Sequence, residues 1–77
     1  MTTKSRADAF SLARHSRYDA LKSLLAEGEA DVGIRDPKGN TLLHVACQNG
    51  GRRIAKLLLR EGANVDAVNA QGNTALH

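Results

Sequence analysis

Three histidines, His15, His44 and His77, and the single cysteine, Cys47, are the imidazole and thiol groups of this 77-residue chain that could act as general bases, nucleophiles or metal ligands. Imidazole and thiol groups supply much of this chemistry near neutral pH. His44 and His77 each follow a threonine by three residues. If that threonine is the N-cap of a helix, its hydroxyl and the imidazole meet on one face, and the second ring nitrogen can reach a neighbouring loop carbonyl. The spacing thus permits a structural role for these histidines as an alternative to catalysis or metal binding.

Other active-site patterns are missing from the sequence. The remaining hydroxyl side chains fall at expected helix caps and turns, which gives no Ser-His-Asp arrangement. The glycines fall at expected helix ends and hairpin tips, without the G-x-x-x-x-G-K pattern of a phosphate-binding loop. We therefore expect no catalytic residue, cofactor or metal, and no enzyme activity.

The charge of the chain is mildly basic and mixed in sign. A formal net charge of +3 comes from 11 basic and 8 acidic residues, and Arg52-Arg53 is the one basic doublet among the interspersed charges. Phe10 and Tyr18 are the only aromatic residues, so the chain has no platform on which nucleic-acid bases could stack. The composition therefore disfavours nucleic-acid binding and favours a solvated surface.

The sequence also bears on the compartment. Its longest apolar runs, such as residues 57–59, are far shorter than the roughly 20 residues of a membrane span. Residues 1–19 mix charged and polar side chains and lack the apolar stretch of a signal peptide. A single cysteine excludes an intrachain disulfide and favours a reducing compartment. We expect no membrane association and a cytoplasmic or nuclear location.

An internal repeat organises the chain. The sequence D-P-K-G-N-T-L-L-H-V-A, residues 36–46, has a second copy in N-A-Q-G-N-T-A-L-H, residues 69–77. Five positions recur 33 residues later, pairing Gly39 with Gly72, Asn40 with Asn73, Thr41 with Thr74, Leu43 with Leu76, and His44 with His77. Self-similarity at such a period is typical of stacked-repeat proteins.

The two copies and the segment between them, C-Q-N-G-G-R-R-I-A-K-L-L-L-R-E-G-A-N-V-D-A, resemble the 33-residue ankyrin repeat. The resemblance implies an all-α fold, a solenoid of stacked helix-turn-helix units with short β-hairpin loops, incomplete at the C-terminus. Residues 1–77 would form a single module with a divergent N-terminal cap repeat (5–35), one full repeat (36–68) and the start of a third (69–77).

Periodicity and capping patterns predict two helix pairs. Ser5-x-x-Asp8 and Ser16-x-x-Asp19 read as capping boxes that open the first two helices. Apolar residues follow each at helical spacing, and Gly28 ends the second helix. The second pair is predicted from Thr41 to Gly50 and from Arg52 to Glu61. Its apolar stripes include Ile54, Leu57 and Leu58.

A loop without helical period joins the pairs. Residues 29–40 favour a short extended hairpin, with Pro37 at the second turn position and Gly39 at positive φ. Val65 is predicted as the inward anchor of the next loop.

The resemblance implies roles for individual residues. Thr41, His44, Gly39, Gly72, Thr74 and His77 would be structural, with the histidines tying one repeat to the next. Cys47 would be a small packing residue at the helix–helix contact. Hairpin tips and the exposed side of each first helix would form a concave surface for a protein partner. The candidate contact residues are Arg14, His15, Arg35, Pro37, Lys38, Asn40, Gln48, Asn49, Val68, Ala70, Gln71 and Asn73.

The predicted function is therefore a non-enzymatic scaffold or adaptor module for protein–protein interaction, with a partner that the sequence does not identify. The alternative is a basic helical module that contacts nucleic-acid phosphates through Arg52, Arg53, Lys56 and Arg60. Because no second cap follows residue 77, we also expect an uncovered C-terminal face, including Ile54 and Leu58, that could mediate self-association.

Overall fold

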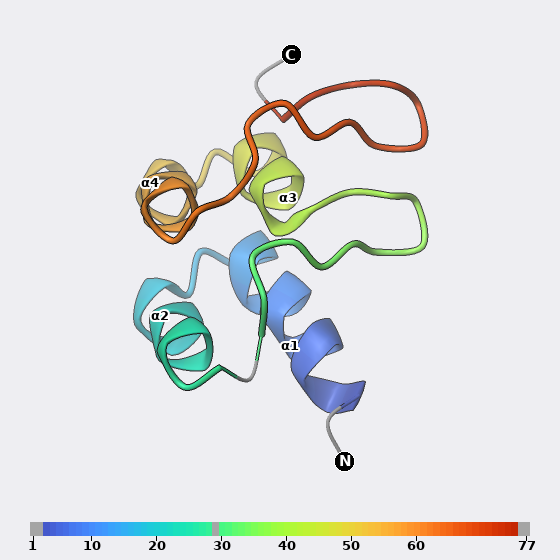
Figure 1. The fold of residues 1–77 in the computed structure, drawn as a ribbon. Helices are drawn as coiled ribbons and strands as arrows, with labels where there is room; N and C mark the ends of the chain where they lie inside the picture. Colours follow the sequence, from blue (N-terminus) through green and yellow to red (C-terminus); the bar gives the residue numbers. More distant parts are fainter. Residues whose placement is uncertain (1–2, 29, 76–77) are drawn as a thin grey trace.

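The computed structural model describes residues 3–28 and 30–75 (Figure 1). Within these residues the elements are four helices, α1 (Thr3–Arg14), α2 (Tyr18–Ala26), α3 (Leu42–Gln48) and α4 (Arg52–Arg60). Two isolated antiparallel bridges, Arg35 with Thr41 and Val68 with Thr74, close two hairpin-like loops. We call these the first hairpin (residues 35–41) and the second hairpin (residues 68–74).

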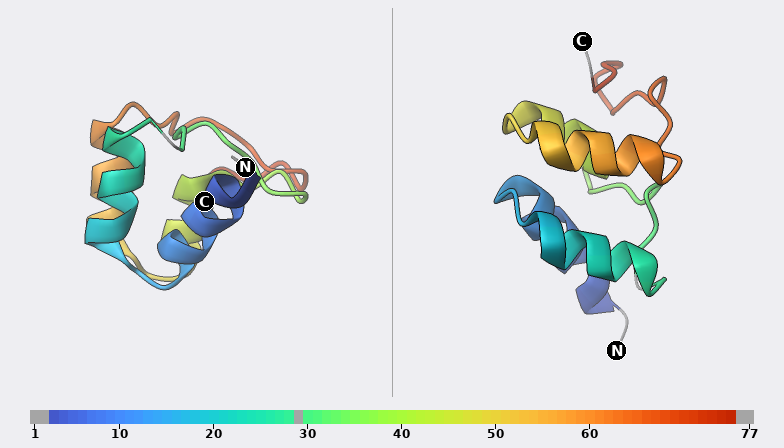
Figure 2. Two further views of the ribbon diagram at one scale, coloured as in Figure 1. Left: turned by 90° about the horizontal axis from the view of Figure 1, so that it is seen from below. Right: turned by 90° about the vertical axis from the view of Figure 1, so that its left-hand side faces the viewer.

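The helices form two stacked layers. Helices α1 and α2 pack together as one helix pair, and α3 and α4 form the next. Between the layers, α1 contacts α3 and α2 contacts α4. Both hairpins project to the same side of the stack, one above the other, as Figures 1 and 2 show. The fold is an all-α solenoid, as the sequence predicts.

The core lies between the layers and follows the predicted helical stripes. Ala9, Phe10 and Ala13 from α1 are buried, and Leu21 from α2 joins them. Short helix α3 is buried along most of its length, from Leu42 to Ala46. It lies against both α1 and α4, so even its small residues are covered.

Helix α4 contributes the predicted apolar stripe to the core, but the prediction that Ile54 and Leu58 lie on an uncovered face is wrong. Ile54 and Leu58 are 1% and 0% exposed, because α4 packs against both α3 and α2. Among the described residues, the large apolar side chains that are exposed are instead Leu59, Val65 and Val68.

Both predicted serine caps are also wrong. Helix α1 already includes Thr3, so Ser5 lies inside the helix and cannot be its N-cap. Ser16 takes a positive φ of 57° in the turn after α1. Arg17 is the N-cap residue of α2, without a side-chain capping bond. A short capping pattern predicts that a helix starts nearby but does not fix the residue at which it starts.

The loop after α4 differs from the prediction at one position. Val65 is 40% exposed, and Ala67, at 8%, takes the inward position. A tight turn causes this, because the Asn64 side chain accepts from the Asp66 N–H at 2.9 Å and the Asn64 carbonyl accepts from the Ala67 N–H at 3.3 Å. Val32, in the preceding loop, does pack against the core.

Candidate functional site

The first hairpin is organised by the carboxylate of Asp36. Its Oδ1 accepts hydrogen bonds from the N–H groups of Lys38 at 2.9 Å and Asn40 at 2.8 Å. The Gly39 N–H closes the turn on the Asp36 carbonyl at 2.9 Å, and Gly39 has the expected positive φ of 80°. Burial raises the pKa of the Asp36 carboxyl, but these hydrogen bonds, with the Asn40 side chain and the charge of Lys38, bring the pKa below its ordinary value.

The second hairpin repeats this design with an amide. The Oδ1 of Asn69 accepts from the N–H groups of Gln71 at 2.9 Å and Asn73 at 3.1 Å. The Gly72 N–H bonds to the Asn69 carbonyl at 2.9 Å, and Gly72 has a φ of 79°. Asp36 and Asn69 therefore hold equivalent turns, each through one side-chain oxygen.

Backbone and side-chain bonds join the two hairpins. The Ala70 N–H donates to the Lys38 carbonyl at 3.0 Å, and the Asn69 amide donates to the Asn40 side-chain oxygen at 2.9 Å. The hairpins approach so closely that a Cβ added at Gly39 would lie 2.8 Å from the Ala70 nitrogen. The two tips therefore form one connected unit.

Arg35 adds a third link from the base of the first hairpin. Its guanidinium donates to the Gly39 carbonyl at 2.8 Å and to the Val68 carbonyl, 33 residues further along the chain, at 2.7 Å. The side chain is exposed, but its Nη1 is engaged within the protein.

His44 makes the contacts that the Thr-x-x-His spacing permits. Thr41 is the N-cap of α3, and its N–H and hydroxyl lie 3.1 Å and 2.7 Å from the His44 Nδ1. The Nε2 lies 2.8 Å from the Asn73 carbonyl. Because the Thr41 N–H can only donate and the Asn73 carbonyl can only accept, the tautomer with its proton on Nε2 satisfies both bonds. The imidazole, 2% exposed, thus joins the start of α3 to the second hairpin.

The second copy of the motif is described only in part. Thr74 is half-buried and forms the bridge with Val68. His77, the predicted counterpart of His44, lies outside the described residues.

The predicted contact residues fall into separate groups. Asn40 differs from the expected exposed tip residue, since it is only 9% exposed and its side chain bonds to Asp36 and Asn69, so it helps to hold the hairpins together. Asn73 is half-buried, and its carbonyl accepts the hydrogen bond from His44. Asn49 is exposed, but its amide donates to the Val45 carbonyl at 2.8 Å. The other exposed candidates, besides Arg35, are Arg14, His15, Pro37, Lys38, Gln48, Val68, Ala70 and Gln71.

Several of these exposed residues surround one hollow. It has a volume of about 510 Å³ and lies between the hairpins and the C-terminal end of α3. The hollow is lined by one lysine, four side chains with primary amides and two small apolar residues. The lining residues are Pro37, Lys38, Asn40, Gln48, Asn69, Ala70 and Gln71. Such a surface can exchange hydrogen bonds with a backbone or a polar side chain while Pro37 and Ala70 offer apolar contact.

Sequence reasoning missed the residues that build the tips. Asp36 and Asn69 align at the 33-residue period, and both types favour turns in which the side chain bonds to backbone two residues on. That recurrence was the available signal. The link from Arg35 to Val68 has no comparable local signal, because it joins residues from different hairpins.

The described residues offer little support for a reactive thiol, a metal site or a membrane-spanning helix. Cys47 is half-buried against the core, and burial raises the pKa of its thiol, which disfavours the reactive thiolate. Residues 3–28 and 30–75 hold no group of three or more His, Cys, Asp or Glu side chains placed to bind a metal ion. None of the described helices has the length and apolar character needed to cross a membrane.

Comparison with known proteins assigns the family. A family model for ankyrin repeats in three copies matches residues 10–77. The chain belongs to the ankyrin repeat family. Ankyrin repeats are generally protein–protein interaction modules, and proteins of the family are generally non-enzymatic scaffolds.

Individual relatives agree with this assignment. The chain is 44% identical over 54 residues to protein fem-1 homolog A-like of Mus musculus, covering 70% of this chain and 8% of the relative. It is 50% identical over 56 residues to protein fem-1 homolog A of Danio rerio, covering 73% and 9%. It is 37% identical over 62 residues to ankyrin repeat domain-containing protein 13B of Homo sapiens, covering 80% and 10%. The chain thus spans about a tenth of the length of these relatives.

Proposed function

We propose that this ankyrin repeat chain is a non-enzymatic scaffold or adaptor module that binds a protein partner through its hairpin tips and the adjoining end of α3. The repeat division at 5–35, 36–68 and 69–77 and a cytoplasmic or nuclear location belong to the same proposal. One observation supports the proposed binding surface. The tips are fixed in the free protein by the bonds between the hairpins, while the side chains of Lys38 and Gln71 stay exposed beside the 510 Å³ hollow.

This arrangement supports binding for a physical reason. A partner that docks on flexible loops must order them, and that entropy is lost from the affinity. Here the Lys38–Ala70 and Asn40–Asn69 bonds order the backbone before a partner arrives. The exposed side chains then determine which partner fits.

Affinity capture from a reducing cell extract tests the proposal. Wild-type chain and a Lys38→Ala/Gln71→Ala variant are compared by quantitative mass spectrometry. A matched control, Lys22→Ala/Lys56→Ala, changes two exposed residues on α2 and α4. We expect the tip variant to lose partners that the control retains. If both variants retain the same partners, the tips are not the binding surface.

The second candidate is binding to nucleic-acid phosphates. Arg52, Arg53, Lys56 and Arg60 are all exposed along α4, away from the hairpins. An affinity that falls steeply with salt, and falls further when Lys56 and Arg60 become glutamine, would favour this candidate. A binding affinity that depends mainly on the tip residues Lys38 and Gln71 would favour the protein-binding scaffold.

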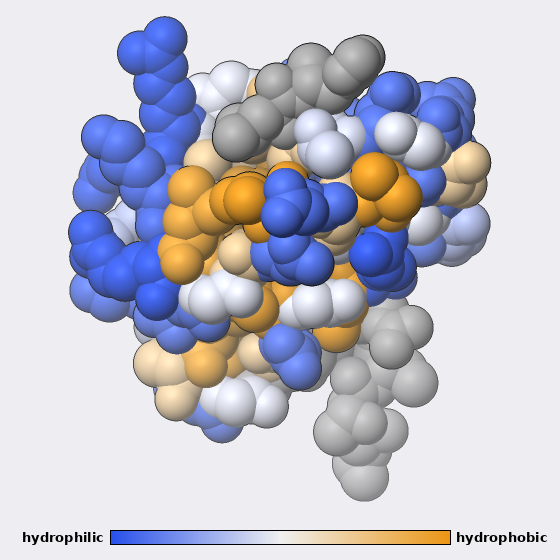
Figure 3. Space-filling view, turned by 45° about the horizontal axis from the view of Figure 1, so that its top comes forward, coloured by the Kyte–Doolittle hydropathy of each residue, from blue (hydrophilic) through white to orange (hydrophobic). Residues whose placement is uncertain are grey.

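We also propose self-association through the face that carries α3, α4 and the second hairpin. Leu59 is 38% exposed on α4 and Val65 is 40% exposed in the loop that follows. Apolar side chains gather in a band across this side of the molecule (Figure 3). Sedimentation over a wide concentration range should show a dimer that Leu59→Lys/Val65→Lys abolishes. A wild-type chain that remains monomeric throughout would contradict the proposal.

A further inference from the structure

A second hollow lies at the turns that join the helices of each pair. Its volume is about 380 Å³, and its lining comes from the α1–α2 turn and the α3–α4 turn. It shares no lining residue with the hollow at the hairpin tips. The lining residues are Ser16, Tyr18, Gly50, Gly51, Arg52, Arg53 and Ile54.

Two arginines line this hollow, and a third belongs to the other turn that contributes to its lining. Arg52 and Arg53 line it from one side, and Arg17 stands between Ser16 and Tyr18, which line it from the other. We call Arg17, Arg52 and Arg53 the arginine patch. All three are exposed. The segments 14–18 and 48–54 together hold four arginines and no acidic residue.

Acidic residues gather at the opposite end of the helices. Glu27 and Glu61 follow the last turns of α2 and α4, and Asp31 and Asp66 lie in the loops beyond. Near the patch, Asp19 in the first turn of α2 is the one acidic neighbour in the local sequence. Basic residues also occur at that end, since Arg60 lies in the last turn of α4, but the two turns beside the hollow hold no acidic residue.

The position of the patch is unfavourable for helix stability. Arg17 and Arg52 stand at the starts of α2 and α4. Positive charge is destabilising at a helix N-terminus, because the helix dipole is positive there. Helix stability therefore does not explain Arg17 and Arg52 at these two turns.

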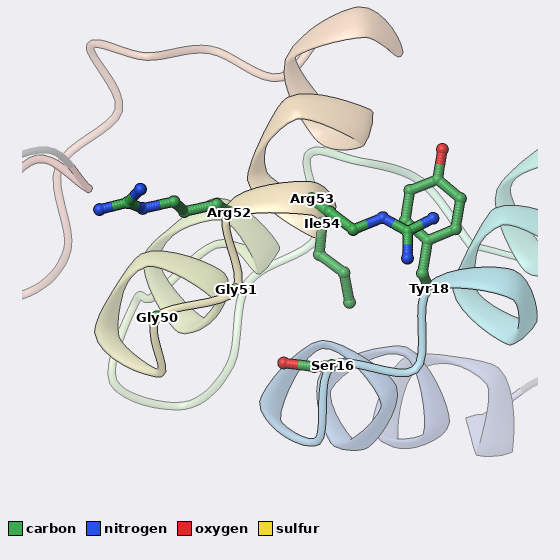
Figure 4. Close-up of a pocket in the computed structure, with 7 residues that line it drawn as sticks. All are labelled: Ser16, Tyr18, Gly50, Gly51, Arg52, Arg53 and Ile54. Carbon is green, nitrogen blue, oxygen red and sulfur yellow. The ribbon is translucent and has the colours of Figure 1, made fainter.

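Packing preorganises part of the patch. The Arg53 guanidinium carbon lies 4.5 Å from the centre of the Tyr18 ring, within the range of a cation–π interaction. Figure 4 shows Arg52 and Arg53 extending to opposite sides of Ile54, with Ser16 across from them on the other turn. The hollow thus has the half-buried Tyr18 ring and the buried Ile54 at its base, with the guanidinium groups of Arg52 and Arg53 on either side.

We propose that the arginine patch binds an acidic peptide segment of a protein partner, which places one apolar side chain in the hollow and carboxylates on either side. Guanidinium groups bind carboxylates through paired hydrogen bonds. An apolar anchor in a pocket is the usual centre of such a contact. This surface is separate from the hairpin tips, so one chain has two partner sites with different chemistry.

Fluorescence anisotropy with a labelled Glu-Glu-Phe-Glu-Glu peptide tests the proposal. We expect the Arg17→Gln/Arg52→Gln variant to weaken binding about tenfold or more. The matched control is Lys56→Gln/Arg60→Gln, which removes the same charge from exposed positions along α4. It should weaken binding much less. Lys38→Ala/Gln71→Ala should leave binding of this peptide unchanged, which separates the test from that of the hairpin tips.

Peptide variants and competitors complete the test. Replacing the peptide glutamates by glutamine should abolish binding, and replacing phenylalanine by alanine should weaken it. Equal binding of the glutamine peptide, or equal loss in both double variants, would overturn the proposal. So would tighter binding of an oligonucleotide of equal charge, which would assign the patch to nucleic acid. Salt-sensitive dimerisation that Arg17→Gln/Arg52→Gln removes would instead assign it to the acidic end of a second copy.

Discussion

Helices α1 and α3 occupy equivalent places in successive layers and share one apolar core, but they differ at one aligned residue. At the residue that aligns with Phe10, α3 has His44, which bonds to its own N-cap and to the second hairpin. Phe10 of α1 is an apolar residue buried in the core. Apolar burial is strong and non-directional, whereas a hydrogen bond fixes a distance and an angle. The comparison indicates that Phe10 contributes through apolar burial, whereas His44 sets the position of the second hairpin relative to α3.

The largest expected effect is the loss of Phe10. Phe10→Ala should lower the free energy of unfolding by about 3 to 5 kcal/mol, since it removes a buried ring and leaves a cavity. Phe10→Leu, which keeps much of the volume, should lose less than about 1.5 kcal/mol. Urea unfolding followed by circular dichroism measures both. A Phe10→Ala variant more stable than His44→Ala would reverse the comparison.

His44→Ala should lower the free energy of unfolding by about 1 to 3 kcal/mol, because it leaves the buried Thr41 N–H and the Asn73 carbonyl without their partner. His15→Ala is the matched control, since His15 is exposed, and it should change stability by less than about 0.5 kcal/mol. The same urea titration compares them. Equal effects from the two substitutions would show that the imidazole of His44 contributes nothing to the link.

How far the sequence anticipates these differences depends on how local their causes are. The core stripe of α4 and the Thr41–His44 contact follow from spacings of three or four residues, and both were predicted. The caps at Ser5 and Ser16 and the inward Val65 were wrong, because short patterns do not show where a helix starts or how an aperiodic loop turns. The bond between Asn40 and Asn69 was not predicted, because it joins residues that are 29 positions apart.

Alanine substitutions at Gly39 and Gly72 distinguish the cost of a left-handed backbone conformation from the cost of a close contact between the hairpins. Gly39 and Gly72 have φ values of 80° and 79°, so alanine costs about 1 to 2 kcal/mol at either position. At Gly39 the new Cβ would lie 2.8 Å from the Ala70 nitrogen, whereas no atom of the described residues lies within 4 Å at Gly72. Gly39→Ala should therefore be less stable than Gly72→Ala by at least about 1 kcal/mol. Thermal melts that coincide would mean that the hairpins are not in contact.

Asp36 makes the first hairpin sensitive to acid, unlike the second, which uses Asn69. The pKa of the Asp36 carboxyl in the folded state lies below its ordinary value. The ionised carboxylate therefore contributes its full share to the free energy of unfolding above about pH 4, and this share is lost as the pH falls through the folded-state pKa. Asp36→Asn should keep the Oδ1 acceptor and remove this part of the acid response. Urea unfolding from pH 6 downward measures the difference. Identical pH profiles for the two proteins would exclude a contribution from Asp36.

The smallest effect is expected at the exposed tips. Lys38→Ala/Gln71→Ala should change the free energy of unfolding by less than about 0.5 kcal/mol per residue, because neither side chain is buried. Circular dichroism and the melting midpoint should be nearly unchanged. Strong destabilisation would show that these side chains pack within the protein.

The bond between the Lys38 carbonyl and the Ala70 N–H has a consequence for how such a surface can change in evolution. It joins main-chain atoms only, so it is compatible with any residue type except proline at positions 38 and 70, where both N–H groups are used. The spacing of the tips is therefore inherited independently of the residues that they display. New partners can be selected, or engineered from a library at these positions, by substitution alone and without a redesign of the backbone.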